Sequence, residues 1–321
     1  ILTDPTLDPP VRALVVYGAN PMATIPNQGL LARGLQRDDL FTVVHEQFLT
    51  DTARYADYVL PATTQLEHYD LVGAWGHPYL TLNQPAIAPL GESVPTTEVL
   101  RRLATRLGLD ESYLQTSDEQ IIRDTLASND PWLEGITWER LQEDGWAKLN
   151  IPDPWVPYAA GGFPTATGRA EFYSESMAAA GRDPLPGYVP IAGEVSVEYP
   201  LTLISGKSAL HFLNSSFANL PRHLKAEQEP RLLMHPDDAA PRGIADNDWV
   251  QVCNAQGQLS LHVTLGEAVI PGVVAMPSGW WASRSPGGVS ANLLTPDGLS
   301  AAAGGGAFHD ARAGVARLVR E

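Results

Sequence analysis

The first 110 residues alternate short apolar runs with segments of helix length, and this alternation constrains the fold more than any other feature of the sequence. The apolar runs are 13–17, 41–45 and 58–60, and helical patterns lie at 27–35 and 96–107. Strands that alternate with helices form parallel sheets, whose ligands bind beyond the carboxyl ends of the strands. The pattern therefore predicts a Rossmann-like α/β domain over residues 1–110, which could be incomplete at its N-terminus.

The pattern changes twice further along the chain. Residues 111–195 combine helix signals with passages rich in Pro and Gly, and we predict a mixed helical and loop region that connects two domains. Within it, residues 163–173 read as a turn that leads into a strand. From residue 196 onward short strands separated by turns predominate, and the clearest signal is a hairpin formed by 249–253 and 258–265. This arrangement predicts a small β-barrel over residues 196–321.

One stretch of the predicted barrel domain, Leu201–Leu220, combines an apolar strand with many polar side chains. The strand runs into Ser205-Gly206-Lys207, and a segment that carries His211, Asn214 and Ser215 follows. A glycine that allows close backbone approach, next to many neutral donors, suits a large polar ligand. A buried strand followed by a capped turn would give the same pattern, so both interpretations remain open here.

The composition of the 321 residues limits the classes of function. A net charge of −16 argues against non-specific binding to nucleic acid or to an anionic membrane, because the phosphate field would repel the chain. No apolar run is long enough to span a membrane. The single cysteine, Cys253, excludes an internal disulfide framework, a zinc-thiolate site and an iron-sulfur cluster held by this chain alone.

No motif for hydrolysis or nucleophilic catalysis is present, and Gly18-x-Asn20 is not a dinucleotide fingerprint. A metal site built from Glu67, His68, Asp70 and His77 is conceivable, but no paired helical spacing supports it, and a loop packed on the sheet is the preferred interpretation. The glycines at 304–306 could let the backbone approach a ligand or could simply form a turn. The sequence signals binding rather than catalysis.

Three separated blocks of the sequence resemble the C-terminal half of the prokaryotic molybdopterin oxidoreductases, the dimethyl sulfoxide reductase and formate dehydrogenase family. The first block comprises Tyr17-Gly18-Ala19-Asn20-Pro21 with the residues 43–53 and 56–61 that follow it. The second runs from Ala239 to Gly257, and the third is Asn292-x-Leu294-Thr295 with the glycine-rich tail before Phe308. Their order and spacing extend over nearly the whole chain, although 111–160 is poorly covered.

The resemblance implies a fold and a cofactor. The barrel would be of the double-psi type, the α/β domain would bind nucleotide, and together they would hold two molybdopterin guanine dinucleotides with molybdenum or tungsten. Glu46 would accept hydrogen bonds from a guanine, and Lys207 would contact a pyrophosphate. The cofactor-binding residues that the resemblance implies are Gly18, Asn20, Pro21, Glu46, Gly206, Lys207, His211, Asn214, Ser215, Asn292 and Thr295.

The family's metal ligand and the cysteines of its 4Fe-4S cluster lie toward the N-terminus, and this sequence contains neither. We therefore expect no catalytic residue and no protein ligand to the metal in this chain, which alone would be inactive. The residues Ile1-Leu2-Thr3 lack the features of a signal peptide and look like an interior cut, so any targeting signal would lie upstream.

The expected partners are the N-terminal region of the same polypeptide and an electron-transfer subunit, with no nucleic acid and no membrane span. An alternative reading is a non-catalytic module or scaffold subunit that binds the pterin dinucleotide.

Overall fold

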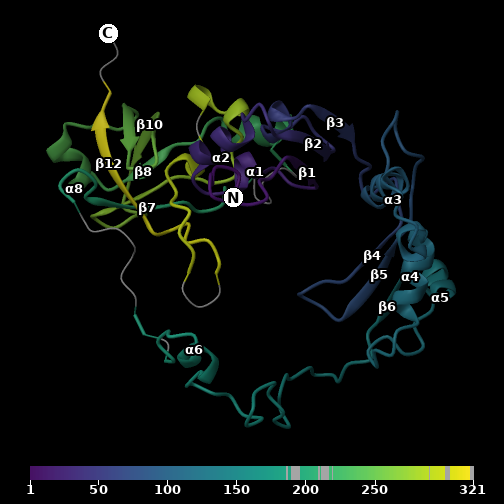
Figure 1. Cartoon of the computed structure of the whole chain (residues 1–321). Coiled ribbons are helices and arrows are strands. Elements are labelled where there is room, and N and C mark those ends of the chain that lie inside the picture. The colour runs from purple at the N-terminus through teal and green to yellow at the C-terminus, as the bar shows by residue number, and fades with distance from the viewer. Residues whose placement is uncertain are drawn as a thin grey trace. The chain divides into compact units, whose positions relative to one another are not determined.

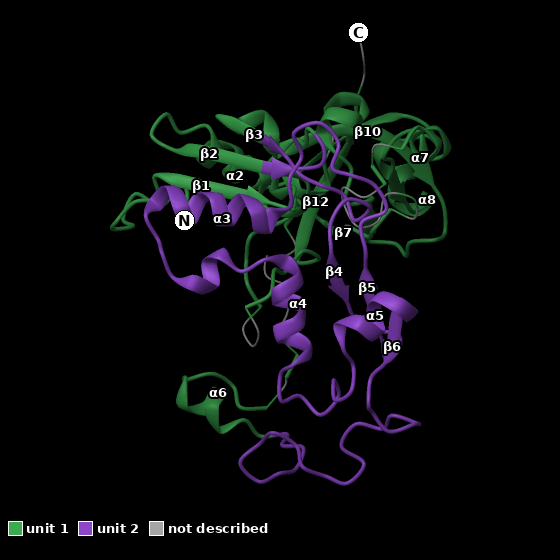
Figure 2. Cartoon of the chain, turned by 90° about the vertical axis from the view of Figure 1, so that its right-hand side faces the viewer, with its two compact units in different colours: residues 1–44, 49–59, 173–321 green, residues 45–48, 60–172 purple. Residues whose placement is uncertain are grey.

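The computed structural model describes residues 1–185, 187–188, 196–208, 210, 217–218, 220–288, 290–300 and 304–318. These residues form two compact units (Figure 2). Unit 1 contains residues 1–44, 49–59 and 173–321, and unit 2 contains residues 45–48 and 60–172. Unit 1 thus unites the start of the predicted α/β domain with the predicted barrel domain. The division into 1–110, 111–195 and 196–321 stays a prediction.

A parallel three-stranded sheet, in the order β1-β2-β3, forms the α/β part (Figure 1). Its elements are β1 (Ala13–Tyr17), α1 (Pro21–Thr24), α2 (Gln28–Leu35), β2 (Phe41–Glu46) and β3 (Tyr58–Pro61). Val16 and Val44 are buried on one face of the sheet and pack with Ala53. On the opposite face Val15, Tyr17, Phe41 and Tyr58 are exposed, although parallel sheets are normally covered on both faces.

Six strands of unit 1 close into a barrel in the order β10-β8-β11-β7-β12-β9. The strands are β7 (Leu201–Ile204), β8 (Leu232–Met234), β9 (Trp249–Cys253), β10 (Gln258–Leu265), β11 (Val273–Ala275) and β12 (Ala311–Arg317). Alternate residues point inward, so that Val250, Val252 and Leu261 belong to one buried core. The predicted fold class, an α/β part with a parallel sheet followed by a β-barrel, is confirmed.

The hairpin between β9 and β10 depends on Asn254 and Gly257. The side chain of Asn254 accepts hydrogen bonds from the N–H groups of Gln256 and Gly257 and donates to the carbonyl oxygens of Leu294 and Arg312. A Cβ atom at Gly257 would lie 3.3 Å from the carbonyl oxygen of Leu293, so the turn has little room for a side chain. The turn thereby ties the hairpin to two other segments of the barrel.

Short helices complete unit 1. They are α6 (Glu175–Ala179), α7 (Pro221–Glu227) and α8 (Pro236–Ala239), with 3-10 turns at Thr52–Tyr55, Ala240–Arg242, Ala282–Arg284, Pro286–Gly288 and Ala291–Leu293. The predicted strand at the end of 163–173 is wrong, because residues 168–173 form no strand and α6 follows. Pro164 and the left-handed Gly168 interrupt the extended backbone there.

Unit 2 contains an antiparallel sheet, in the order β4-β5-β6, with two helices packed on it. Its elements are β4 (Asp70–Val72), β5 (Tyr79–Asn83), α3 (Thr96–Leu107), α4 (Asp118–Leu126), α5 (Trp138–Asp144) and β6 (Trp146–Lys148), with a 3-10 turn at Ser112–Gln115. The core joins Leu80 and Leu82 of β5 to Ile122 of α4 and Leu141 of α5. The loop expected around residues 65–91 is therefore in part a β-hairpin.

Candidate functional site

Two strands of the barrel end in the same Ser-Gly pair, and the sheet brings these pairs together. β7 and β11 are parallel neighbours, with Leu203 opposite Val274. Beyond the strand ends, Ser278 donates from its N–H to the carbonyl oxygen of Gly206 at 2.7 Å. Ser205-Gly206 and Ser278-Gly279 therefore lie side by side at the carboxyl ends of parallel strands, where ligands commonly bind.

A cavity of about 290 Å³ opens beside these pairs in unit 1. Three of the predicted cofactor-binding residues line it: Gly206, Lys207 and Asn292. A Cβ atom at Gly206 would have no atom within 4 Å, so a ligand can approach the backbone there. Lys207 is exposed and supplies a positive charge to a chain of net charge −16. The remaining lining residues are Ala23, Thr24, Ser205, Ser278, Gly279, Phe308 and His309.

Asn20 lies just before α1, the helix whose last residues line this cavity. Its side chain is 2% exposed, and Oδ1 accepts hydrogen bonds from the N–H and the hydroxyl of Thr52. Its Nδ2 atom is buried without a hydrogen-bond partner among the described residues. Buried amide donors are nearly always paired, so this atom is a candidate for a bound acceptor. Gly18 has a φ of +56° and turns the chain into Asn20.

Asn292 and Thr295 connect the barrel to the α/β part. The Nδ2 group of Asn292, which is 4% exposed, donates to the carbonyl oxygen of Ala23 at 2.8 Å. The N–H of Asn27 donates to the carbonyl oxygen of Thr295, whose hydroxyl donates to the carbonyl oxygen of Asn292. Asn292 therefore lines the cavity while its amide bonds within the protein, and Thr295 lies outside the lining. Direct contact of either with a cofactor stays a prediction.

His309 is a lining residue that the sequence-based list lacks. Its Nδ1 atom accepts a hydrogen bond from the N–H of Ser205 at 3.4 Å, which assigns the proton of a neutral ring to Nε2. The repeated Ser-Gly after two apolar runs was a usable signal for Ser278 and Gly279. No local pattern marked His309, because its approach to Ser205 depends on the closure of the barrel.

A carboxylate of α7 binds two described residues that follow β7. Glu227, at the end of α7, accepts hydrogen bonds from the hydroxyl of Ser208 and from the N–H of Leu210. Ser208 and Leu210 are thereby anchored to α7. His211, Asn214 and Ser215, which were also predicted to bind cofactor, lie outside the described residues.

Glu46, the predicted guanine ligand, lies in unit 2 at the end of β2. It is half-buried, and its Oε1 accepts a hydrogen bond from the N–H of Gln47 at 2.7 Å. Burial raises the pKa of Glu46, against a smaller lowering by this hydrogen bond. A half-buried carboxylate of this kind gains from an additional hydrogen-bond donor.

The described residues contain no group of three or more His, Cys, Asp or Glu side chains placed to hold a metal ion. The four residues considered as a metal site, Glu67, His68, Asp70 and His77, therefore do not form such a group. Burial raises the pKa of the Cys253 thiol, which disfavours the thiolate form. Among the residues that the structure describes, no helix is both long enough and apolar enough to cross a membrane.

Comparison with known proteins identifies two matching family models. Residues 7–106 match the model described as molybdopterin oxidoreductase, and residues 201–312 match the model described as molydopterin dinucleotide binding domain. The first model contains the block around Asn20 and Glu46. The second contains the cavity-lining residues of the barrel, among them Gly206 and His309.

Individual oxidoreductases and a hydratase are also similar to this chain over most of its length. The chain is 40% identical over 312 residues to a probable oxidoreductase, YoaE, of Bacillus subtilis, covering 97% of this chain and 45% of that protein. It is 31% identical to acetylene hydratase of Syntrophotalea acetylenica over 87% of this chain and 38% of that protein. The solved structure of acetylene hydratase from Pelobacter acetylenicus superposes with a TM-score of 0.79 at 27% identity, over 96% of this chain and 44% of that one. The chain thus spans less than half the length of these relatives.

Proposed function

Because the chain belongs to the molybdopterin oxidoreductase family, we propose that it holds the pterin dinucleotide cofactor of an enzyme that performs two-electron redox chemistry. The observation that carries the proposal is the cavity at the ends of β7 and β11, which joins the paired Ser-Gly turns to α1. When bound, the cofactor supplies a molybdenum or tungsten centre, at which the redox chemistry occurs. The substrate and the electron acceptor belong to the whole protein and not to this cavity.

The residues around the cavity fit such a group. A dinucleotide offers a pyrophosphate and many hydrogen-bond acceptors, and the cavity offers Lys207, the hydroxyls of Ser205 and Ser278, and open backbone at Gly206. The unpartnered Nδ2 of Asn20 adds a buried donor next to α1. Separately, in unit 2, Glu46 has a carboxylate of the kind that pairs with the N1–H and the amino group of a guanine. In this proposal the chain binds and orients the cofactor and contributes no catalytic residue.

Replacing Gly206 by valine in the full-length protein is expected to lower the cofactor content at least about tenfold, because a side chain would occupy the space that a ligand needs at the backbone. Glu46→Gln replaces one hydrogen-bond acceptor by a donor facing the guanine, and the expected loss of affinity is also about tenfold. The measurement is the amount of GMP released by acid from the purified protein, together with its molybdenum and tungsten content.

The control is Lys225→Met on α7, which removes a positive charge that does not line the cavity. Unchanged GMP and metal in both Gly206→Val and Glu46→Gln would remove these residues from the site. GMP without metal in the unmodified protein would support the alternative, a non-catalytic module that binds the dinucleotide. Neither group in the unmodified protein would favour a scaffold.

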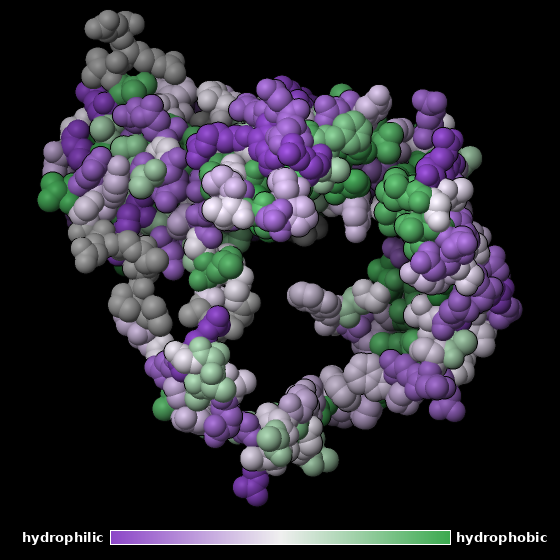
Figure 3. Space-filling model, viewed as in Figure 1, coloured by the Kyte–Doolittle hydropathy of each residue, from purple (hydrophilic) through white to green (hydrophobic). Residues whose placement is uncertain are grey.

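The exposed face of the β1-β2-β3 sheet supports a second part of the proposal, namely that further polypeptide covers it in the whole protein. Val15, Tyr17, Phe41 and Tyr58 present apolar side chains there, and Figure 3 shows apolar residues at the surface around these strands. The ring centroids of Phe41 and Tyr58 on this face are 5.9 Å apart. We propose that the remainder of the polypeptide, which makes up more than half of the relatives' length, packs on this face.

This proposal predicts that Phe41→Asp destabilises the full-length protein by about 1.5 to 3 kcal/mol, because a charge would replace a buried aromatic ring. The measurement is urea denaturation of the full-length protein. Tyr113→Asp, at another exposed aromatic residue, is the control and is expected to change stability by less than about 0.5 kcal/mol. If both substitutions have the small effect, the sheet face is open in the whole protein.

A further inference from the structure

His309 lines the cavity at β7 and β11, and the sequence-based list of cofactor ligands lacks it. It lies just before β12, and its Nδ1 atom accepts a hydrogen bond from the N–H of Ser205 at 3.4 Å. A neutral imidazole has one donor and one acceptor nitrogen, so this contact leaves Nε2–H as the donor of the ring. Among the residues that the structure describes, none accepts a hydrogen bond from Nε2. His309 therefore has one side-chain donor to offer to a ligand.

Other neutral donors that line this cavity already bond within the protein. The hydroxyls of Thr24 and Ser278 donate to backbone carbonyl oxygens at 3.2 and 3.1 Å, and Nδ2 of Asn292 does so at 2.8 Å. A ligand could engage one of these donors only if its bond within the protein were broken. In the described part of the chain, the hydroxyl of Ser205 and Nε2–H of His309 have no such bond. A ligand therefore gains the hydrogen bond at His309 without the loss of another.

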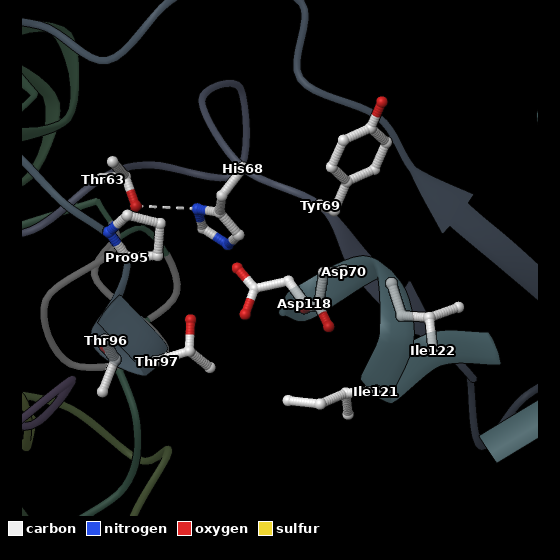
Figure 4. A pocket seen from close by; sticks show the side chains of 10 residues that line it. All are labelled: Thr63, His68, Tyr69, Asp70, Pro95, Thr96, Thr97, Asp118, Ile121 and Ile122. Carbon is white, nitrogen blue, oxygen red and sulfur yellow. Dashed lines mark hydrogen bonds between the residues drawn. The ribbon is translucent and has the colours of Figure 1, made fainter. Parts of the chain in front are cut away.

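The charge of the lining favours an anionic ligand. Lys207 lines the cavity, and the described lining residues include no Asp or Glu, although the chain has 37 acidic residues. The cavity in unit 2 differs, because Asp70 and Asp118 line it together with His68 (Figure 4). Phosphate groups bind strongly where a cationic side chain and N–H donors converge. Lys207 and His309 bring these two kinds of group to the cavity at β7 and β11.

We propose that Nε2–H of His309 donates a hydrogen bond to a pyrophosphate oxygen of the bound pterin dinucleotide. This inference rests on the proposed function, to which it adds a residue and the part of the ligand that the residue contacts. The oxygen carries negative charge, so the hydrogen bond is of the stronger, charge-assisted kind. Because Ser205 already orients the ring, little side-chain freedom is lost when the ligand binds. His309 binds and positions the dinucleotide and takes no part in the redox step.

Two substitutions separate this role from the contact with Ser205. His309→Asn keeps an acceptor at the position of Nδ1 and lacks the donor at Nε2, whereas His309→Gln places an amide N–H at the position of Nε2 and lacks the acceptor at Nδ1. The measurement is the rate at which the purified full-length holoprotein loses its dinucleotide, followed as the GMP that acid still releases from it. His309→Asn is expected to raise this rate at least about tenfold, and His309→Gln to keep it within about threefold.

The matched control is His235→Asn. His235 also lies in unit 1, outside the lining of the cavity, and its Nδ1 atom likewise accepts a backbone N–H, that of Asp237 at 3.1 Å. The rate of dinucleotide loss is expected to stay unchanged in this variant. A rate in His309→Asn no higher than in the unmodified protein would overturn the inference. A rate in His309→Gln as high as in His309→Asn would also overturn it, because the bond to Ser205 would then be the contact that matters.

A second measurement uses the unmodified holoprotein and does not depend on how the variants fold. In protein labelled with ¹⁵N-histidine, Nε2–H of His309 is assigned by its absence from His309→Gln. This proton is expected to exchange with solvent more slowly in the holoprotein than after the dinucleotide is removed, and equal exchange rates would overturn the inference. The proposed function fails separately, since the unmodified protein would then release no GMP at all.

Discussion

Replacing Trp281 by alanine is expected to lower the free energy of unfolding by about 3 to 5 kcal/mol, the usual cost of removing a large aromatic side chain from a core. Trp281 is 1% exposed and packs with Ala23 of α1 and with Ala218. It therefore fills the space between the α/β part and the barrel segments of unit 1. The measurement is equilibrium denaturation in urea, followed by circular dichroism.

Trp75→Ala is the control for this substitution. Trp75 is 107% exposed, so its loss is expected to change stability by less than about 0.5 kcal/mol. The Trp281 variant is also expected to lose cofactor, because Ala23 lines the cavity. A destabilisation of Trp281→Ala no greater than that of Trp75→Ala would show that the ring does not support unit 1.

Replacing Glu67 by glutamine is expected to remove a stabilising contribution that depends on pH. Glu67 is 6% exposed and accepts hydrogen bonds from the N–H and hydroxyl of Thr64, from the N–H of Leu90 and from the hydroxyl of Ser93. These hydrogen bonds lower the pKa of Glu67 from 4.5 to about 2. The largest contributions come from the N–H groups of Thr64 and Leu90. A lowered pKa in the folded state stabilises the protein above pH 4.5, and this stabilisation is lost as the pH falls toward 2.

The measurement is the melting temperature of both proteins between pH 7 and pH 2. Glu67→Gln is expected to melt well below the unmodified protein at pH 7, and the two curves are expected to converge near pH 2. Glu92→Gln changes an exposed carboxyl in the segment between β5 and α3, which also contains Leu90 and Ser93, and serves as the control. A gap between the curves that stays constant over the whole pH range would contradict the role of the ionised carboxylate.

The sequence predicted those elements whose signal is local. The strand at Ala13–Tyr17 is a continuous apolar run, and the strand at Phe41–Glu46 has the apolar residues Phe41, Val43 and Val44. The helix from Asp118 lies in the region of predicted helix signals and begins after Ser117, whose side chain accepts a capping hydrogen bond from the N–H of Gln120. Gly108 ends α3 in the left-handed conformation, as a C-terminal glycine does. In each case neighbouring residues alone determine the structure.

Elements that depend on distant partners were not predicted. The sequence of β12, Ala-Arg-Ala-Gly-Val-Ala-Arg, has little apolar bulk and becomes a strand because β7 and β9 pair with it on either side. β4 is only three residues long, and β5 supports it. The helix predicted at 96–107 has apolar residues that are only partly buried, since Leu103 and Leu107 are exposed. The spacing of apolar residues predicts a helix, but it does not predict which other elements pack against that helix.

The residues of the candidate site also include some that a local pattern predicted and some that depend on distant partners. Gly206 and Lys207 could be predicted because a strand end with a glycine and polar residues has a local signature. Resemblance to a family added Asn20 and Asn292, and the structure brings Asn292 into one cavity with Gly206 and places Asn20 next to α1. His309 required the closed barrel, because its contact with Ser205 joins residues 104 positions apart.

The hydrogen bond from Asn292 to Ala23 joins residues 269 positions apart. A ribosome that adds 5 to 20 residues per second needs roughly 13 to 54 seconds to travel that distance along the chain. During this time Ala23 and Thr24 exist without the barrel segments that complete their cavity. The cavity is therefore complete only after the chain has been synthesised as far as its last lining residue, His309.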